Sequence, residues 1–300
     1  MDGVEEAEIL QANVPLKRCP RLSVAVPASI VSDIPHLREK TSKIGFVGRA
    51  LAAFRVDEVV VFSDTQGQSR SRDVELVAAL LSYLETPQYL RKHLFRIQPE
   101  LSFGGILPPL RTPHHPIENR ERDLAIGEIR EGTVVSRSGN NVLVDVGVER
   151  PILIPVANVS MNSRVTVKIL DKGGQFVGQL VSPDSVDSYW GYKVTVADKT
   201  LGWMLKERAF GLVIATSRLG EPFMNMADKI RSEWIKTKSV LVAFGAPSKG
   251  LHEILRQENL DLADVTDFVV NTVPNQATET VRTEEALYAT LSVLNVFMPS

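Results

Sequence analysis

The chain changes its secondary-structure rhythm twice, and this change restricts its fold more than any other feature. From residue 21 to residue 84, strand-length apolar runs alternate with helix-length segments. Strands are predicted at 21–27 and 56–62, and helices at 36–54 and 73–84, with Asp73 as the N-cap of the second helix. Residues 63–72 are polar and are predicted to be flexible. Alternation of strand and helix is typical of a mainly parallel sheet.

Glycine and proline residues then interrupt the alternation, and a different pattern follows. Residues 102–116 contain two glycines and four prolines, which argues against helix or central strand and predicts a linker. Five short strands are expected at 126–136, 141–146, 150–155, 164–170 and 175–181, with turn residues such as Ser138-Gly139-Asn140 between them. This pattern suits a small closed β-barrel of the OB type, although other small barrels fit it too.

The strand–helix rhythm returns near residue 192, with strands expected at 210–216, 239–244 and 267–271 and a last helix at 282–297. The predicted fold is therefore α/β: one α/β domain, made of residues 1–117 and 186–300, interrupted by an inserted barrel at 118–185. Tyr189 and Trp190 follow the barrel, where either base stacking or packing at a junction would suit them. Trp203 and Trp234 are predicted to be packing residues.

Composition excludes several classes of protein. Cys19 is the single cysteine, so a disulfide scaffold and a cysteine zinc cluster are excluded, and a free thiol fits the cytoplasm. The acidic start and the short apolar runs predict neither a signal peptide nor a membrane span. A net charge of −2 leaves only local basic clusters for nucleic acid, at 70–72, 91–96 and 111–115, and each of these clusters favours a solvated surface when taken singly.

Known cofactor fingerprints are absent from the sequence. It contains neither a GxGxxG run after the first strand nor a P-loop. No metal is expected, because His114 and His115 are adjacent and cannot share a face at ligand spacing. Glycines that would allow close approach of a nucleotide-like cofactor occur in two other stretches, 43–49 and 241–251, and a third candidate stretch, 271–287, contains Pro274 in its loop.

These three stretches resemble the three motifs of SPOUT RNA methyltransferases, the trefoil-knot class. In the first, Gly45 is followed by Arg49, an alanine-rich helix and a valine-rich strand; the second contains Phe244-Gly245 and Gly250-Leu251; the third is 271–287. The runs 105–110 with 113–115, 215–218, and 271–274 with 280–286 resemble more narrowly the archaeal and eukaryotic members named as RNA uridine N3 methyltransferases, which carry an inserted OB-like domain. The resemblance extends from about Ser23 over almost the whole chain.

The resemblance implies an S-adenosylmethionine-dependent RNA methyltransferase with a knot in its last third, acting on RNA as a homodimer. It places the cofactor beside Thr216, Arg218, Gly245, Asn271, Thr272, Pro274 and Gln276. Arg49 is the first candidate for stabilising charge on the acceptor base, since a guanidinium stays charged, and Arg282 and Glu285 come second. A helix-start ion pair is the stronger interpretation of Glu285.

Two other functions compete with this interpretation. A non-catalytic RNA-binding or assembly protein that keeps the knot is favoured by Ala277, which stands where relatives usually carry glycine. A methyl group there is tolerable if φ is negative. A nicotinamide-dependent dehydrogenase lacks its fingerprint.

Overall fold

A computed structural model describes residues 14–64, 69–155, 158–172, 174–207 and 209–299. The chain splits into two compact units, which are treated separately below. The sheet unit contains Arg18–Leu84, Pro99–Pro108 and Tyr192–Ser300. The barrel unit contains Met1–Lys17, of which 14–17 are described, together with Glu85–Gln98 and Pro109–Gly191.

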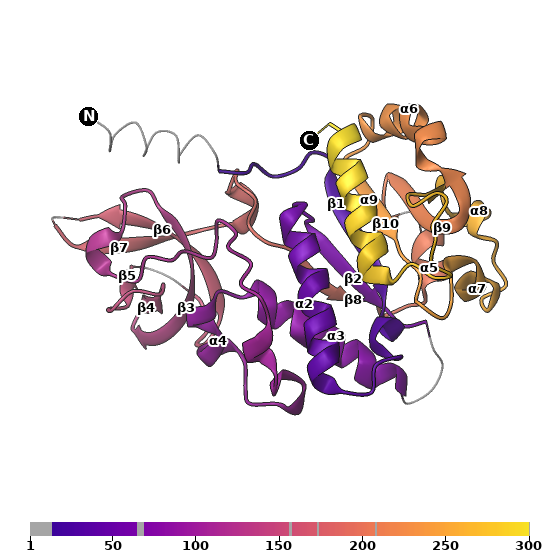
Figure 1. Ribbon diagram of the computed structural model, residues 1–300. Helices are drawn as coiled ribbons and strands as arrows, with labels where there is room; N and C mark the ends of the chain where they lie inside the picture. The colour runs from indigo at the N-terminus through magenta and orange to yellow at the C-terminus, as the bar shows by residue number, and fades with distance from the viewer. Residues whose placement is uncertain (1–13, 65–68, 156–157, 173, 208, 300) are drawn as a thin grey trace. The chain divides into compact units, whose positions relative to one another are not determined.

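A six-stranded parallel sheet forms the centre of the sheet unit, in the order β11-β9-β10-β1-β2-β8 (Figure 1). The strands are β1 (Arg21–Pro27), β2 (Glu58–Phe62), β8 (Lys193–Val196), β9 (Leu212–Pro222), β10 (Ser239–Ala243) and β11 (Phe268–Asn271). The predicted strands of the α/β part are confirmed, while the short edge strand β8 was not predicted. All-parallel sheets need cover on both faces, and the helices of this unit supply it.

The two faces of the sheet have separate cores. Ala25, Val60 and Ala243 belong to a buried cluster with residues of α5 (Leu201–Lys206), α7 (Leu251–Arg256) and α8 (Leu262–Val265). Their neighbours Val24 and Val242 are also fully buried and, because successive strand residues alternate, point to the opposite face. The other helices are α2 (Leu37–Ala53), α3 (Ser69–Glu85), α6 (Phe223–Trp234) and α9 (Thr283–Phe297), and α2 packs against α9.

Asp73 does not begin a helix, so that prediction is wrong. Helix α3 starts at Ser69, four residues earlier, and part of the stretch predicted to be flexible, 65–68, lies outside the described residues. The Asp73 carboxylate instead accepts a hydrogen bond from Ser32 Oγ at 2.8 Å and pairs with Lys40 Nζ at 3.3 Å. Its tertiary partners, and not a local cap, account for an aspartate at this position.

The barrel unit contains a closed five-stranded barrel with the strand order β3-β4-β5-β7-β6. Its strands are β3 (Ile129–Ser138), β4 (Asn141–Asp145), β5 (Ile152–Ile154), β6 (Arg164–Asp171) and β7 (Phe176–Val181). β3 pairs with both β4 and β6 and so closes the barrel; β5 and β7 pair in parallel, and the other neighbours pair antiparallel. The five predicted strands are confirmed. The predicted insert 118–185 stays a proposal, since this unit also takes in α4 (Gln88–Leu94) and flanking segments.

A buried charge network holds distant segments of the barrel unit together. Arg164 donates two hydrogen bonds to the Glu85 carboxylate, at 2.6 and 3.0 Å, and one to Glu131 at 2.6 Å. Burial would raise the pKa of Glu85, but the Arg164 guanidinium and the His114 side chain outweigh it and lower this pKa to about 2. Trp190 also donates its indole N–H to Glu131, at 2.5 Å. Trp190 is thus part of the unit's internal packing.

Three other predictions about side chains are decided by their burial. Trp234 has no exposed surface, as predicted for a packing residue, whereas Trp203 is 49% exposed, so that prediction is wrong. Tyr189 is buried and cannot stack on a base. His114 is buried as well, which contradicts a solvated surface at 111–115. The rings of His114 and His115 both donate hydrogen bonds from Nε2 to the Glu85 carbonyl, so they are held inside the unit.

Candidate active site

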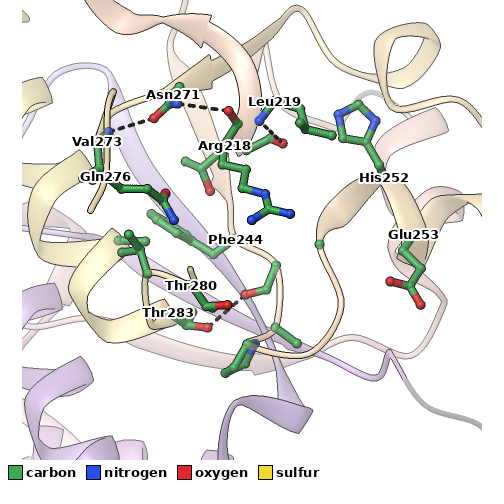
Figure 2. A pocket seen from close by; sticks show the side chains of 18 of the residues that line it. Arg218, Leu219, Phe244, His252, Glu253, Asn271, Val273, Gln276, Thr280 and Thr283 are labelled. Atoms are coloured by element: carbon green, nitrogen blue, oxygen red, sulfur yellow. Dashed lines mark hydrogen bonds between the residues drawn. The ribbon is translucent and has the colours of Figure 1, made fainter. Parts of the chain in front are cut away.

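Three segments of the chain meet at the carboxyl edge of the parallel sheet, where such sheets bind ligands. They are the later part of β9 and the loops that follow β10 and β11; these three strands are neighbours in the sheet although β11 lies about fifty residues beyond β9 in the chain. Together with α7 and the start of α9 they enclose a cavity of about 450 Å³ (Figure 2). This volume lies within the range of about 300–1,000 Å³ that is usual for small-molecule sites.

An interruption of the β9–β11 ladder forms one wall of the cavity. Val269 lies opposite Ala215, but the next residue, Val270, lies opposite Glu221. Residues 216–220 therefore leave the ladder and extend over the carboxyl edge of the sheet. A Cβ atom on Gly220 would lie 2.7–2.8 Å from backbone atoms of Val269 and Val270, so the two segments lie in direct backbone contact.

Side chains of the cavity lining fasten the loops to one another. The Asn271 amide donates to the Arg218 carbonyl at 3.0 Å and accepts from Val273 N–H at 2.9 Å. The Arg218 guanidinium donates to the Glu279 carbonyl at 3.0 Å, and Thr283 Oγ1 donates to the Gly245 carbonyl at 3.0 Å. Figure 2 shows the Arg218 guanidinium extending into the space between these loops. The bonds join the later part of β9 and the loops after β10 and β11 into one rigid frame.

Gly245 is required by the backbone of its own loop. A Cβ atom there would lie 3.0 Å from Leu251 N, 3.1 Å from Gly250 Cα and 3.2 Å from Lys249 O. The loop after β10 therefore turns back closely on itself before α7 begins, and Ala246 N–H bonds to the Lys249 carbonyl at 2.9 Å. The sequence predicts that a glycine here allows the close approach of a ligand. The close turn is a second reason, within the protein itself, why position 245 requires glycine.

Most of the predicted cofactor residues lie around this one cavity. The residues that the structure brings together there are Thr216, Arg218, Gly245, Asn271, Thr272 and Gln276. Pro274 belongs to the same loop but is exposed and, within the described chain, does not contribute to the lining. Gln276 donates to the carbonyls of Thr278 and Glu279, at 2.9 and 3.2 Å, and so shapes the turn that leads to α9.

The predicted catalytic arginines are placed apart from the cavity lining. Arg49 lies on α2 and is partly exposed, while Arg282 is the exposed N-cap residue of α9; neither is among the described residues that line the cavity. Glu285 accepts a hydrogen bond from Arg282 N–H at 2.9 Å. It therefore acts as a helix cap, which is a structural role, as expected, although the bond is to the backbone and is not an ion pair.

The departure at Ala277 has no conformational cost. Ala277 is not among the residues with a positive φ; in this loop Asn275 adopts the left-handed conformation, at φ 60°. A methyl group at position 277 is therefore compatible with the loop path. The observation that had favoured a non-catalytic protein loses its force.

Sequence reasoning missed the contribution of α7. His252, Glu253 and Arg256 all line the cavity, as do Glu279 and Thr280 of the last loop. Their signal was present, because His252 directly follows the second glycine-containing stretch. Which face of this helix meets the cavity depends on the exact start of α7 at Leu251, and a boundary of that kind is not fixed by sequence patterns.

Within the described ranges, no group of three or more His, Cys, Asp or Glu side chains is arranged to hold a metal ion. Nor does any described helix combine the length and the apolar character needed to cross a bilayer. The chemistry of the cavity therefore has to be argued from the side chains and backbone groups that line it.

Comparison with known proteins identifies the family. Residues 21–294 match the family model described as "Putative RNA methyltransferase". An uncharacterised protein of Haloarcula marismortui is 35% identical over 291 residues, which cover 91% of this chain and 98% of that protein. The proteins named 28S rRNA (uridine-N(3))-methyltransferase of Mus musculus and Homo sapiens are 34% and 33% identical over 304 residues, covering 91% of this chain and 75% and 77% of theirs. The match spans both units, and this chain belongs to that family of RNA methyltransferases.

Proposed function

We propose that this RNA methyltransferase uses S-adenosylmethionine to methylate N3 of a uridine in large-subunit ribosomal RNA. The cavity at the carboxyl edge of the sheet carries this proposal, because it gathers predicted cofactor residues from three separate segments. The names of the mammalian relatives support the choice of uridine N3 and of ribosomal RNA.

The cavity suits a nucleoside with a charged amino-acid tail. Its volume of about 450 Å³ is adequate. Backbone groups of residues 271–274 offer donors and acceptors for an adenine edge, and Thr216, Thr272 and Gln276 surround the same space. Gly245, whose loop turns back closely on itself, belongs to the same lining. When bound, S-adenosylmethionine supplies a methyl group already activated by its sulfonium, so the protein has to position the acceptor and manage its proton.

The knotted SPOUT fold is part of the proposal. Its support is the close contact of two chain segments: residues 216–220 lie against the backbone of Val269 and Val270, and the segment 271–279 is then bonded to Arg218 from both sides. A chain that passes this closely between its own earlier loops suits a threaded topology, which is rare among proteins.

We assign reading of the RNA to the barrel unit. The barrel order β3-β4-β5-β7-β6, with the parallel β5–β7 pair, suits the OB type, whose barrels commonly bind oligonucleotides. RNA affinity based on phosphate contacts would fall as salt rises. The net charge of −2 makes such contacts local, and not spread over the surface.

Arg49 is proposed to stabilise charge on the acceptor base from a second subunit. Within one chain Arg49 does not line the cavity, so it would reach a cavity only across an interface. Exposed apolar residues occur on three neighbouring helices: Phe46 on α2, Met224 on α6 and Val296 on α9. α2 packs against α9, and the rings of Phe223 and Phe297 lie 5.7 Å apart, so the three helices form one continuous region suited to a homodimer.

The test of cofactor use is thermal unfolding with added ligand. S-adenosylmethionine and S-adenosylhomocysteine should each raise the melting temperature, because a ligand that binds only the folded state stabilises it; NAD should not. Gly245→Val should abolish the shift, since the new side chain displaces the turn at 249–251. Gly105→Val is the matched control, because a Cβ atom on Gly105 meets nothing within 4 Å. An unaltered shift in Gly245→Val would place the cofactor elsewhere.

A further inference from the structure

Helix α7 presents three ionisable side chains to the cavity that the rest of the protein does not use. His252, Glu253 and Arg256 all contribute to the lining. Over the described residues, none of the three takes part in a side-chain hydrogen bond or an ion pair. An unengaged set of charged and titratable groups beside a cavity is typical of a functional site and not of a structural one.

Several other polar side chains of the cavity are already engaged within the protein. Thr216 Oγ1 donates to the Ala243 carbonyl at 3.0 Å, and Thr272 Oγ1 lies 2.8 Å from Thr290 Oγ1. Asn271, Gln276 and Thr283 hold the loops, as described above. These side chains shape the cavity, whereas those of α7 remain available to a ligand.

His252 differs from its neighbours because its Nε2 atom is buried and has no partner among the described residues. Buried polar atoms without partners are uncommon in folded proteins, and each one needs an explanation. A substrate group in the adjoining cavity would supply the missing partner. Imidazole is also the side chain best suited to exchange a proton at neutral pH.

The cavity has two sides, which Figure 2 shows with Arg218 between them. Asn271, Val273 and Gln276 line one side, and His252 and Glu253 line the other. If the methyl donor lies against the loop 271–276, as the proposed function requires, the acceptor base must enter on the α7 side. Transfer of the methyl group then takes place between the two sides.

We propose that His252 is the base that removes the N3 proton of the uridine; this inference rests on the proposed function. The N3–H bond breaks and its proton passes to the unpaired Nε2 of His252. The electron pair left on N3 forms the new bond to the methyl carbon, and the bond from that carbon to sulfur breaks with its electrons returning to sulfur. The imidazolium then loses its proton to water when the product leaves.

The charged groups around His252 suit this step. The other ionisable side chains of the described lining are Arg218, Arg256, Glu253 and Glu279. Negative charge spreads over the uracil ring as N3 loses its proton, and the two guanidinium groups would stabilise it.

The test is single-turnover methylation of large-subunit ribosomal RNA, purified from a strain that lacks this gene, with tritiated S-adenosylmethionine. His252→Ala should lower the rate by about 100-fold or more at pH 7, the usual scale of general-base catalysis. Added imidazole should restore part of this rate by entering the vacated space, and it should not rescue His252→Gln, which fills that space. His36→Ala is the matched control, since His36 is exposed at the start of α2.

Two further measurements separate a base from a cofactor ligand. Calorimetric binding of S-adenosylhomocysteine should be the same in His252→Ala and wild type. The pH–rate profile of wild type should contain a rising limb that is missing in His252→Ala, because a general base acts only in its deprotonated form.

The outcomes are distinct. A wild-type rate and pH profile in His252→Ala would overturn the assignment, as would a tenfold or greater loss of S-adenosylhomocysteine binding in both His252 variants. If wild type itself transfers no methyl group to this RNA, the proposed function fails and this inference fails with it. If wild type is active, the variants test His252 alone.

Discussion

Arg49 is the residue whose role depends most on what surrounds it. On α2 it is partly exposed and lies outside the lining of the cavity of its own chain. A guanidinium that acts only in the transition state changes turnover and leaves the affinity for the methyl donor alone. Its two possible roles, stabilising charge on the base or anchoring a phosphate, therefore have different kinetic signatures.

We expect Arg49→Ala to lower single-turnover methylation by roughly 100-fold, the effect of losing one preorganised donor, with binding of S-adenosylhomocysteine unchanged. Arg49→Lys should recover only part of the rate, because an ammonium lacks the planar two-pronged donor. Arg38→Ala is the control, an exposed arginine on the same helix. If saturating RNA restores the rate of Arg49→Ala, the residue anchors phosphate and does not act on the base.

Individual residues of the site were predictable where they stand in contiguous motifs. Thr216, Gly245 and Asn271 come directly after apolar runs that mark three strands clearly, so the three had to meet at one edge of the sheet. The unpaired Nε2 of His252 was not predictable, because it depends on packing around α7. The exposure of Trp203 was missed for the same reason: the short helix α5 turns this ring outward, where Lys199 Nζ lies 5.7 Å from the ring centre.

At the scale of elements, the network around Glu85 predicts sensitivity of the barrel unit to acid. Burial lowers the pKa of His115 to about 3, so its protonation opposes folding, and stability is lost as pH falls below about 6.5 towards that value. The pKa of Glu85 is lowered from 4.5 to about 2, so its stabilisation is complete above pH 4.5 and is lost as pH falls through 2. The range of His115 begins at the higher pH, and the two ranges overlap between about pH 4.5 and 3.

Replacing Glu85 should remove only the lower of these two ranges. Glu85→Gln should be less stable than wild type by about 3 kcal/mol at pH 7, because Arg164 loses a buried partner, and its free energy of unfolding should change less between pH 4.5 and 2. The decline that begins near pH 6.5 should remain. Urea unfolding of the barrel unit at a series of pH values measures this, with Asp187→Asn, an exposed carboxylate, as the control. Equal slopes below pH 4.5 in wild type and Glu85→Gln would contradict it.

Elements differ in how far the sequence could predict them. The barrel strands were predictable because turn residues such as Gly139 bound short alternating runs. The start of α3 was not predictable. Asp73 is of a residue type that often caps helices, but here its carboxylate pairs with Lys40, and such a tertiary ion pair cannot be read from the sequence. β8 was not predicted because it is only four residues long, and it is a strand only through its pairing with the edge of β2.

At the scale of the whole molecule, the proposed homodimer is the main prediction. Light scattering should give twice the chain mass of 33.1 kDa at micromolar concentration. Met224→Asp or Val296→Asp should give a monomer, since a charge in an apolar interface is costly to bury. Ile97→Asp, which changes a fully exposed residue of the barrel unit, should not.

Mixing variants tests whether Arg49 acts across that interface. Arg49→Ala and Gly245→Val subunits are each expected to be inactive alone. A mixed dimer would contain one cavity that is intact and faces an intact Arg49, so activity should return on mixing. If activity does not return although mixed dimers form, Arg49 serves the cavity of its own chain.

The bonds that fasten the cavity also determine when it can exist during synthesis. The hydrogen bond from Arg218 cannot form until Glu279, 61 residues later, has been added to the chain. The bond to the Gly245 carbonyl likewise requires Thr283, 38 residues later. The barrel unit needs nothing beyond Gly191. A chain is synthesised from its N-terminus at about 5–20 residues per second, so the barrel can fold before the residues that complete the cavity have been added. With the proposed role of the barrel unit in reading RNA, a nascent chain would be able to hold RNA before it is able to modify it.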